Sequence, residues 1–196
     1  MRQVQQLPCL YLITPEPMSA TDKQFFFRLE ACLEASCSLV QLRAKNLSNR
    51  DYCYCAEKAL KLCDRYHARL LLNANPEMAL SVGTHGLHLN SKRLFTSLPP
   101  LGTNLLVAGS CHTSEEIEQA NRLKTDFIVL SPVRATASHP DAPPLGWLKF
   151  FQLAKQANCP VFALGGMTVA DIPKTVAHGG HGIAAIRALW NAGIKN

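Results

Sequence analysis

Residues of the types that bind anions and move protons occur directly after short apolar runs of this sequence. Gln41, Arg43 and Lys45 alternate with apolar residues across the end of one run, and Ser110 and His112 follow another. A neutral imidazole beside the positive end of a helix suits proton transfer or hydrogen bonding near pH 7. The residues therefore predict an anion site with a proton-transferring histidine. A histidine that only bonds a neighbouring loop is the alternative.

Cations gather after alternate apolar runs, whereas acids are scarce in the same places. The cations are Arg43, Lys45, Lys92, Arg93, Arg134 and Arg187, and the nearest acids are Glu16, Asp22 and Asp141. A cleft lined with charge of one sign concentrates ligands of the opposite sign. The pattern predicts an anionic ligand, most simply a phosphate or diphosphate. Ordinary surface lysines and arginines are the alternative.

A pair of glycines adds backbone groups to the predicted anion site. Gly165 and Gly166 follow an apolar run and precede a helical stretch, and Arg187 comes just after the next run. Glycine lets the backbone approach a ligand closely, and the N–H groups at a helix start favour anions. The pair predicts a phosphate-binding turn, although two glycines also make a plain turn.

Further polar candidates lie at the ends of other runs. Asn73 ends one run, and we expect Asn73 and Ser110 to bind substrate. Thr136, Ser138 and His139 belong to a loop rich in hydroxyl groups that carries one imidazole. A loop of this kind could close over the mouth of a site as a lid.

The elements that position these residues alternate regularly along the chain. The apolar runs are Cys9–Ile13, Leu39–Leu42, Arg69–Leu72, Gly86–Leu89, Leu105–Ala108, Phe127–Leu130, Pro160–Ala163 and Gly182–Ala185. Amphipathic stretches follow near 22–36, 49–66, 76–82, 113–124, 146–157 and 169–178. Continuous apolar runs are typical of parallel strands buried on both faces. The order predicts one α/β domain over residues 1–196, a (β/α)8 TIM barrel with its site at the carboxyl ends of the strands. An open doubly wound sheet is the alternative, but it lacks its GxGxxG fingerprint here.

Hydroxyl residues mark the expected helix starts. Thr21, Ser48, Thr113 and Thr168 are each followed three residues later by an acid or amide. This spacing is typical of an N-cap or a capping box.

Composition excludes several classes of protein. The 196 residues are 47% hydrophobic and 17% charged, which is ordinary for a globular protein. No apolar run reaches the ~18 residues that a membrane span needs, and residues 1–8 lack a signal-peptide pattern. We therefore expect a cytoplasmic protein without a membrane partner. The net charge of +6 is dispersed rather than clustered, so nucleic acid is not expected as a partner either.

The cysteines form no recognisable site. None of the eight belongs to a CxxC pair or a zinc spacing, so most are expected to be small buried residues. Cys111, between Ser110 and His112, is the exception whose role the sequence leaves open.

Several segments together resemble the thiamine phosphate synthase family, in order from Tyr11 to Leu189. They are Tyr11–Thr14, Gln41–Lys45, Gly86–Leu89, Ser110–His112, Ser131–Val133 with Thr136 and Ser138, Gly165–Met167 and Gly182–Ile186. The family couples a hydroxymethylpyrimidine diphosphate to a thiazole phosphate and releases diphosphate. The resemblance places Gln41, Arg43 and Lys45 at the pyrimidine diphosphate, and Thr136 and Ser138 at the thiazole phosphate or diphosphate. Gly165, Gly166 and Ile186 would bind the thiazole phosphate through backbone N–H groups.

The chain departs from the family pattern where the family holds Mg²⁺. An Asn-Asp pair is expected after strand 3, but the chain has Asn73-Ala74, and a second acid is replaced by Ser91-Lys92-Arg93. A lysine of the strand 6 loop is replaced by His139. Mg²⁺ prefers carboxylate and phosphate oxygens, so we expect no protein ligand for a metal. Lys92 and Arg93 would instead neutralise the phosphate groups directly.

Two related groups keep other functions open. The chain is similar to thiazole tautomerases, which need no such metal and have a histidine where His112 stands. Segments 136–147 and 185–190 also resemble a barrel domain fused behind Nudix hydrolases in some bacteria. The expectations are therefore a synthase, a metal-independent tautomerase that uses His112, or a non-catalytic phosphate-binding domain. A small phosphorylated substrate is expected in each case, and a second copy of the chain or a Nudix hydrolase stays open as a protein partner.

Overall fold

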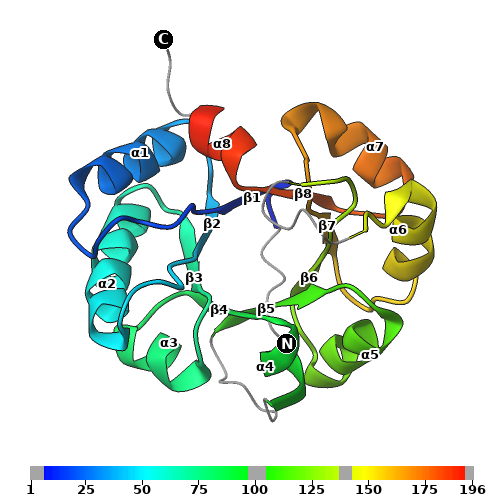
Figure 1. Ribbon diagram of the computed structural model, residues 1–196, viewed down its shortest axis with the longest axis horizontal. Coiled ribbons are helices and arrows are strands. Elements are labelled where there is room, and N and C mark those ends of the chain that lie inside the picture. The colour runs from blue at the N-terminus through cyan, green and yellow to red at the C-terminus, as the bar shows by residue number, and fades with distance from the viewer. Residues whose placement is uncertain (1–6, 97–104, 137–142, 193–196) are drawn as a thin grey trace.

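The computed structural model describes residues 7–96, 105–136 and 143–192, and its strands close into a parallel barrel (Figure 1). The strands follow one another around the barrel in chain order, and β8 pairs with β1 to close it. The predicted (β/α)8 TIM barrel is confirmed, and the open doubly wound sheet is wrong. The strands are β1 (Leu10–Ile13), β2 (Leu39–Leu42), β3 (Arg69–Leu72), β4 (Gly86–Leu89), β5 (Leu106–Cys111), β6 (Phe127–Leu130), β7 (Val161–Ala163) and β8 (Gly182–Ala185).

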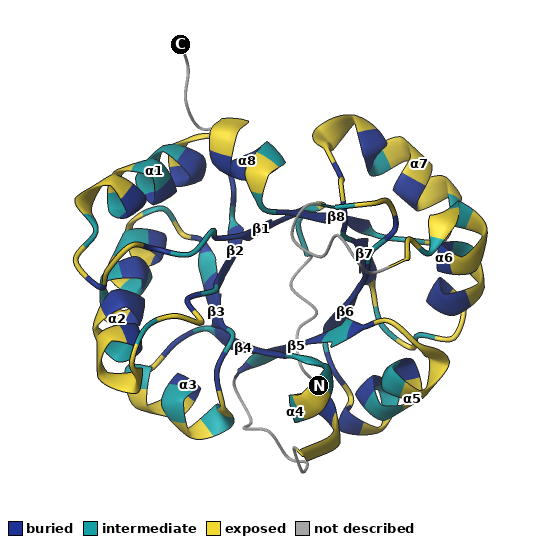
Figure 2. Cartoon of the chain, viewed as in Figure 1, coloured by how far each residue is buried: buried dark blue, intermediate teal, exposed yellow. Residues whose placement is uncertain are grey.

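A helix follows each strand on the outside of the barrel (Figure 1). The helices are α1 (Lys23–Glu34), α2 (Asn49–Arg65), α3 (Pro76–Val82), α4 (Ser91–Thr96), α5 (Ser114–Leu123), α6 (Gly146–Ala154), α7 (Ile172–Ala177) and α8 (Arg187–Ala192), and a 3₁₀ turn, η1 (Val169–Asp171), precedes α7. Figure 2 shows largely buried strands inside a shell of helices whose outer faces are exposed. Because both faces of each strand are covered, the strands read as continuous apolar runs.

An aromatic cluster fills the middle of the barrel. The ring of Tyr11 meets the ring of Phe127 edge-on at a centroid distance of 5.1 Å, and Phe127 meets Phe162 at 5.2 Å. All three side chains are fully buried. Aromatic pairs in such tilted geometries add to the free energy gained from burial. The cluster closes the barrel interior beneath the carboxyl ends of the strands.

The strand bounds differ from the prediction most clearly at β5. This strand continues through Ser110 and Cys111, which pair with Val129 and Leu130 of β6, whereas the apolar run suggested an end at Ala108. The backbone pairing with β6 extends the strand across polar residues that the run alone assigns to a loop. Ser110 therefore stands on a strand rather than in a flexible connection.

Helix capping follows the prediction in three places of four. Ser48 accepts a hydrogen bond from the Asp51 N–H, Thr113 and Glu116 form a capping box, and Thr168 pairs with Asp171 at η1. Thr21 was the wrong residue for α1, because Asp22 caps that helix instead. One carboxylate oxygen of Asp22 accepts from the Phe25 N–H of α1, and the other accepts from the Met18 N–H in the preceding loop, so Asp22 also ties that loop to the helix start.

The cysteines are free thiols, and most of them are buried in the packed apolar layers. Cys111 is fully buried, and burial raises the pKa of its thiol. The structure therefore places Cys111 in the packed core as an uncharged thiol. Among the described residues, no helix combines the length and apolar character that a membrane crossing requires.

Candidate active site

A cavity of about 660 Å³ opens at the carboxyl ends of the strands. It brings together eleven of the predicted site residues: Gln41, Arg43, Lys45, Asn73, Ser110, His112, Thr136, Gly165, Gly166, Ile186 and Arg187. Lys92 and Arg93 are not among the lining residues, and Ser138 and His139 lie outside the described residues. A volume of this size suits a small organic ligand.

Residues without a predicted role complete the wall. His88 lies near the end of β4 and Asn90 directly follows that strand, and both line the cavity. The available signal was a polar residue within or directly after an apolar run. The apolar part of the wall includes Ile13, Leu164 and Met167. Nothing in the local pattern distinguishes such apolar lining residues from the core.

The loop after β2 is held by Glu16. One oxygen of its carboxylate lies 2.5 Å from Nη1 of Arg43, and the other accepts from the Lys45 N–H at 2.7 Å. Both charged side chains are largely covered, so the pair is more than a loose surface contact. Arg43 thus reaches the cavity with a fixed direction and part of its charge offset, and the rim is less cationic there than the sequence suggested.

Arg134 is also neutralised by an acid. Its guanidinium binds both oxygens of Asp171, at 2.6 and 3.2 Å. Burial alone would raise the pKa of Asp171, but hydrogen bonds from Thr168 and Arg134 outweigh it and lower that pKa. This ion pair joins the loop after β6 to the turn before α7. Arg134 therefore has a structural role here.

Arg93 links the residues that follow β3 and β4. Its Nη1 donates to Oδ1 of Asn73 at 2.9 Å, and its backbone N–H donates to Oδ1 of Asn90 at 2.9 Å. Among the described lining residues there is no carboxylate, and the described chain holds no cluster of three potential metal ligands. The donor set that the described residues offer does not fit Mg²⁺, whose preferred protein ligands are carboxylates.

His112 is exposed at the rim, with its ring in a fixed direction. Its Nδ1 lies 2.6 Å from the carbonyl oxygen of Ser131, and its backbone N–H donates to the Glu116 carboxylate of the capping box. A carbonyl oxygen can only accept, so Nδ1 carries the hydrogen. In the neutral ring Nε2 is then the nitrogen that can accept a proton.

The glycine turn is shaped by the loop after β6. Gly165 and Gly166 have φ values of 107° and 65°, in the region that favours glycine. A Cβ on Gly165 would lie 2.9 Å from Cα of Pro132 and 3.0 Å from the carbonyl oxygen of Arg134. The Arg134 N–H also donates to the Gly165 carbonyl at 3.3 Å. The two glycines therefore allow two cavity-lining loops to touch.

His88 is a buried polar residue in the wall of the cavity. Its Nδ1 lies 3.1 Å from the Tyr11 hydroxyl and its Nε2 lies 2.7 Å from Oγ of Ser110. Burial, with the nearby charge of Arg93, lowers the pKa of His88 to about 3. The ring is therefore neutral throughout the physiological range.

We expect His88 to make the fold sensitive to acid. Its folded pKa of about 3 lies below the ordinary value of about 6.5, so the unfolded chain binds a proton that the folded chain excludes. The contribution of neutral His88 to the free energy of unfolding is complete above about pH 6.5 and is lost as the pH falls toward the folded pKa. From pH 7 to 5 the residue lowers the free energy of unfolding by about 2 kcal/mol. Urea unfolding at the two pH values measures this, and His88→Gln removes that share of the loss.

An equal pH dependence in wild type and His88→Gln would contradict the assignment. If the variant does not fold, an NMR titration of the wild-type imidazole decides the matter, because protonation of folded His88 near pH 6 would overturn it.

Comparisons with known proteins agree with this geometry. Residues 10–189 match the family model described as thiamine monophosphate synthase. The chain is 36% identical to the putative thiamine-phosphate synthase 2 of Aquifex aeolicus, over 92% of this chain and 97% of that protein. It is 34% identical to the putative thiamine-phosphate synthase of Geobacter sulfurreducens, over 92% of this chain and 85% of that protein.

A solved structure shows the same fold. The thiamine phosphate pyrophosphorylase of Pyrococcus furiosus superposes with a TM-score of 0.76 at 22% identity, covering 94% of this chain and 91% of that one. The family match spans all eight strands, from β1 to β8. The resemblance drawn from the motifs is confirmed: this chain belongs to the thiamine monophosphate synthase family.

Proposed function

We propose that the protein acts in thiamine biosynthesis and joins hydroxymethylpyrimidine diphosphate to thiazole phosphate. The observation that carries this proposal is a single cavity with two separate sets of anion-binding groups. One set is Arg43 and Lys45 after β2, and the other is the Gly165–Gly166 turn with Arg187 after β7 and β8. Two phosphorylated substrates require two such sets in one cavity. The names of the relatives support the same reaction.

In this reaction the bond between the pyrimidine methylene carbon and the diphosphate oxygen breaks, and diphosphate leaves with the electron pair. The thiazole nitrogen donates its lone pair to the same carbon and forms the new C–N bond. Arg43 and Lys45 offset the charge that grows on the leaving diphosphate. The glycine turn and Arg187 hold the phosphate of the thiazole so that its nitrogen faces the reacting carbon. Because the described residues do not fit Mg²⁺, no step is assigned to a metal.

The direct test is to incubate the protein with both substrates, with and without Mg²⁺, and to measure thiamine phosphate. We expect product, and a loss of about 100-fold in kcat/KM for Arg43→Ala. Arg122→Ala is the matched control, because Arg122 pairs with Glu118 on the exposed face of α5 and is expected to leave turnover unchanged. Absence of thiamine phosphate above background would reject the synthase reaction.

A second candidate is supported by the fixed ring of His112. With Nδ1–H bonded to Ser131, Nε2 can take a proton from a carbon of a thiazole phosphate and return it elsewhere, which is a tautomerisation that needs no metal. His112→Ala would abolish this activity, whereas His178→Ala, outside the cavity lining, would retain it. Unchanged tautomerisation in His112→Ala would rule out this mechanism.

The same assays address the remaining alternatives. Binding of thiazole phosphate without turnover of either substrate set would assign the chain a non-catalytic role. A Nudix hydrolase or a second copy of the chain is the partner we infer for that role, and a binding measurement with each of them tests it. We also infer a cytoplasmic location, which the eight free thiols support because such thiols persist in reducing compartments.

A further inference from the structure

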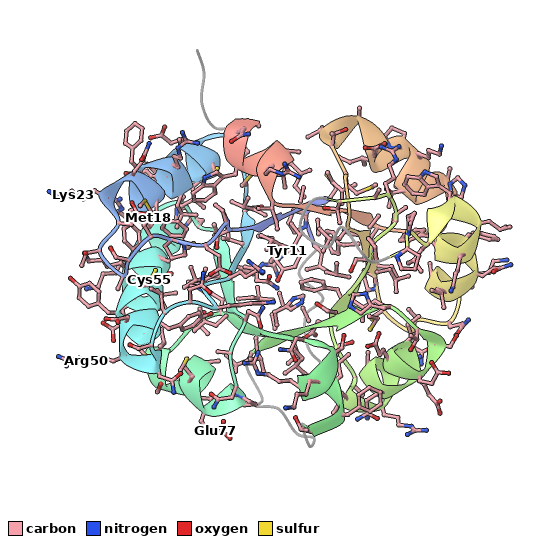
Figure 3. All side chains as sticks on the ribbon, in the orientation of Figure 1. Tyr11, Met18, Lys23, Arg50, Cys55 and Glu77 are labelled. Carbon is pink, nitrogen blue, oxygen red and sulfur yellow. The ribbon has the colours of Figure 1, made fainter. Side chains whose placement is uncertain are left out.

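A chain of hydrogen bonds crosses the interior of the barrel and ends at the cavity. Nε2 of Gln41 donates to the Tyr11 hydroxyl at 3.3 Å, and that hydroxyl lies 3.1 Å from Nδ1 of His88. Nε2 of His88 lies 2.7 Å from Oγ of Ser110, which lines the cavity. Tyr11, labelled near the centre of the barrel in Figure 3, is fully buried, and Gln41 and His88 are each 2% exposed.

The direction of the first bonds follows from what each group can do. The Gln41 amide nitrogen can only donate, so the Tyr11 oxygen accepts from it. The Tyr11 hydroxyl keeps its hydrogen, because burial raises its pKa well above the ordinary value. A buried hydroxyl hydrogen needs an acceptor, and the bonded group that can accept is Nδ1 of His88. Tyr11 therefore donates to His88.

The same reasoning fixes the histidine. With Nδ1 accepting from Tyr11, the neutral ring carries its hydrogen on Nε2, which donates to Ser110 Oγ. Burial and the charge of Arg93 exclude a second proton on the ring. His88 therefore has one tautomer, and this tautomer differs from that of His112, whose hydrogen lies on Nδ1.

Ser110 receives the end of this chain. Its hydroxyl oxygen accepts from Nε2–H of His88, so its own hydrogen is not used by His88 and remains available to a group in the cavity. We propose that Tyr11 and His88 are positioning residues that lock the Ser110 hydroxyl as a hydrogen-bond donor toward bound substrate. The substrate group that accepts from the Ser110 hydroxyl is then one such as an aromatic ring nitrogen or a phosphate oxygen. The substrate part of this inference rests on the proposed function.

The tautomer of His88 tests the proposal without any substrate. In protein labelled with ¹⁵N at histidine, two-dimensional NMR distinguishes a protonated from an unprotonated ring nitrogen, and His88→Gln identifies the signals of His88. We expect Nε2–H with an unprotonated Nδ1 between pH 5 and 8. In Tyr11→Phe the donor to Nδ1 is gone, so both tautomers should appear. A single Nδ1–H tautomer in the wild type would mean that the hydrogen bonds between Tyr11, His88 and Ser110 have the opposite direction, and would overturn the proposal.

Activity tests the consequence for Ser110. Tyr11 does not line the cavity, yet Tyr11→Phe is expected to lower kcat/KM about tenfold, and Ser110→Ala by at least as much. Combining the two should add little, because both changes remove the same directed hydrogen bond. Equal losses from Tyr11→Phe in the wild-type and Ser110→Ala backgrounds would contradict the proposal.

Tyr52→Phe is the matched control for that cycle. Tyr52 is another buried tyrosine, and its hydroxyl donates to the Leu42 carbonyl at 2.9 Å outside the chain of bonds. The Tyr52→Phe variant should lose as much stability as Tyr11→Phe and keep the wild-type kcat/KM. If no variant or wild-type protein turns over either substrate set, the proposed function fails, while the NMR result still decides the direction of the hydrogen bonds.

Discussion

Replacing Gly182 by alanine is expected to lower the free energy of unfolding by about 4 kcal/mol, or to prevent folding altogether. A Cβ on Gly182 would lie 2.1 Å from the carbonyl oxygen of Cys9 and 2.7 Å from its Cα. Both atoms belong to the backbone, so rotation of a side chain cannot relieve the clash. The Ile183 N–H donates to this same carbonyl at 2.9 Å, where β8 meets β1. Urea unfolding followed by circular dichroism measures the effect.

Gly109→Ala is the matched control for this change. A Cβ on Gly109, in β5, would lie 3.0 Å from Cδ2 of Leu94, which is the end of a flexible side chain. We expect a loss of about 1 kcal/mol there. Similar losses of stability in the two variants would show that the backbone can shift where β8 meets β1, and would contradict the expectation for Gly182→Ala.

Replacing Gly165 by alanine is expected to weaken the binding of thiazole phosphate about 100-fold and to destabilise the fold by about 2 kcal/mol. The φ of 107° is strained for any residue with a Cβ, and that Cβ would press on Pro132 in the facing loop. The turn must therefore change shape or move, which removes backbone groups from the cavity wall. Isothermal titration calorimetry with the phosphate ligand measures the first effect, and urea unfolding measures the second.

Gly146→Ala separates strain from the loss of a site. Gly146 also has a positive φ, of 69°, but no atom lies within 4 Å of a Cβ placed there, and it does not line the cavity. It should lose stability and keep ligand affinity. Wild-type affinity in Gly165→Ala would mean that the glycine serves only the contact between the two loops.

The barrel could be predicted because its determinants are local. Each strand is covered on both faces, so its whole run is apolar, and the run itself marks the strand. β5 shows the limit of this reasoning, since its last residues are polar and are held in the strand by pairing with β6. Asp22 shows another limit, because nothing in the sequence says that the carboxylate and not the neighbouring Thr21 hydroxyl will meet the free N–H groups of α1.

The site could be predicted only as a set of positions. Carboxyl ends of parallel strands converge, so residues such as Gln41 and Ser110 had to approach one another. Their partners could not be predicted, because Arg134 meets an acid 37 positions away and Tyr11 meets His88 at a separation of 77. Such contacts depend on the finished fold and leave no periodic signal in the chain.

The pairing of β1 with β8 has a consequence while the protein is being made on the ribosome. Every other strand pairs with the strand made just before it, but β1 leaves the ribosome first and its second neighbour is made last. Until residues 182–185 emerge, the growing sheet keeps two open edges with unpaired backbone groups. The nascent chain is then most exposed to pairing with other chains, and completion of the last strand ends that exposure.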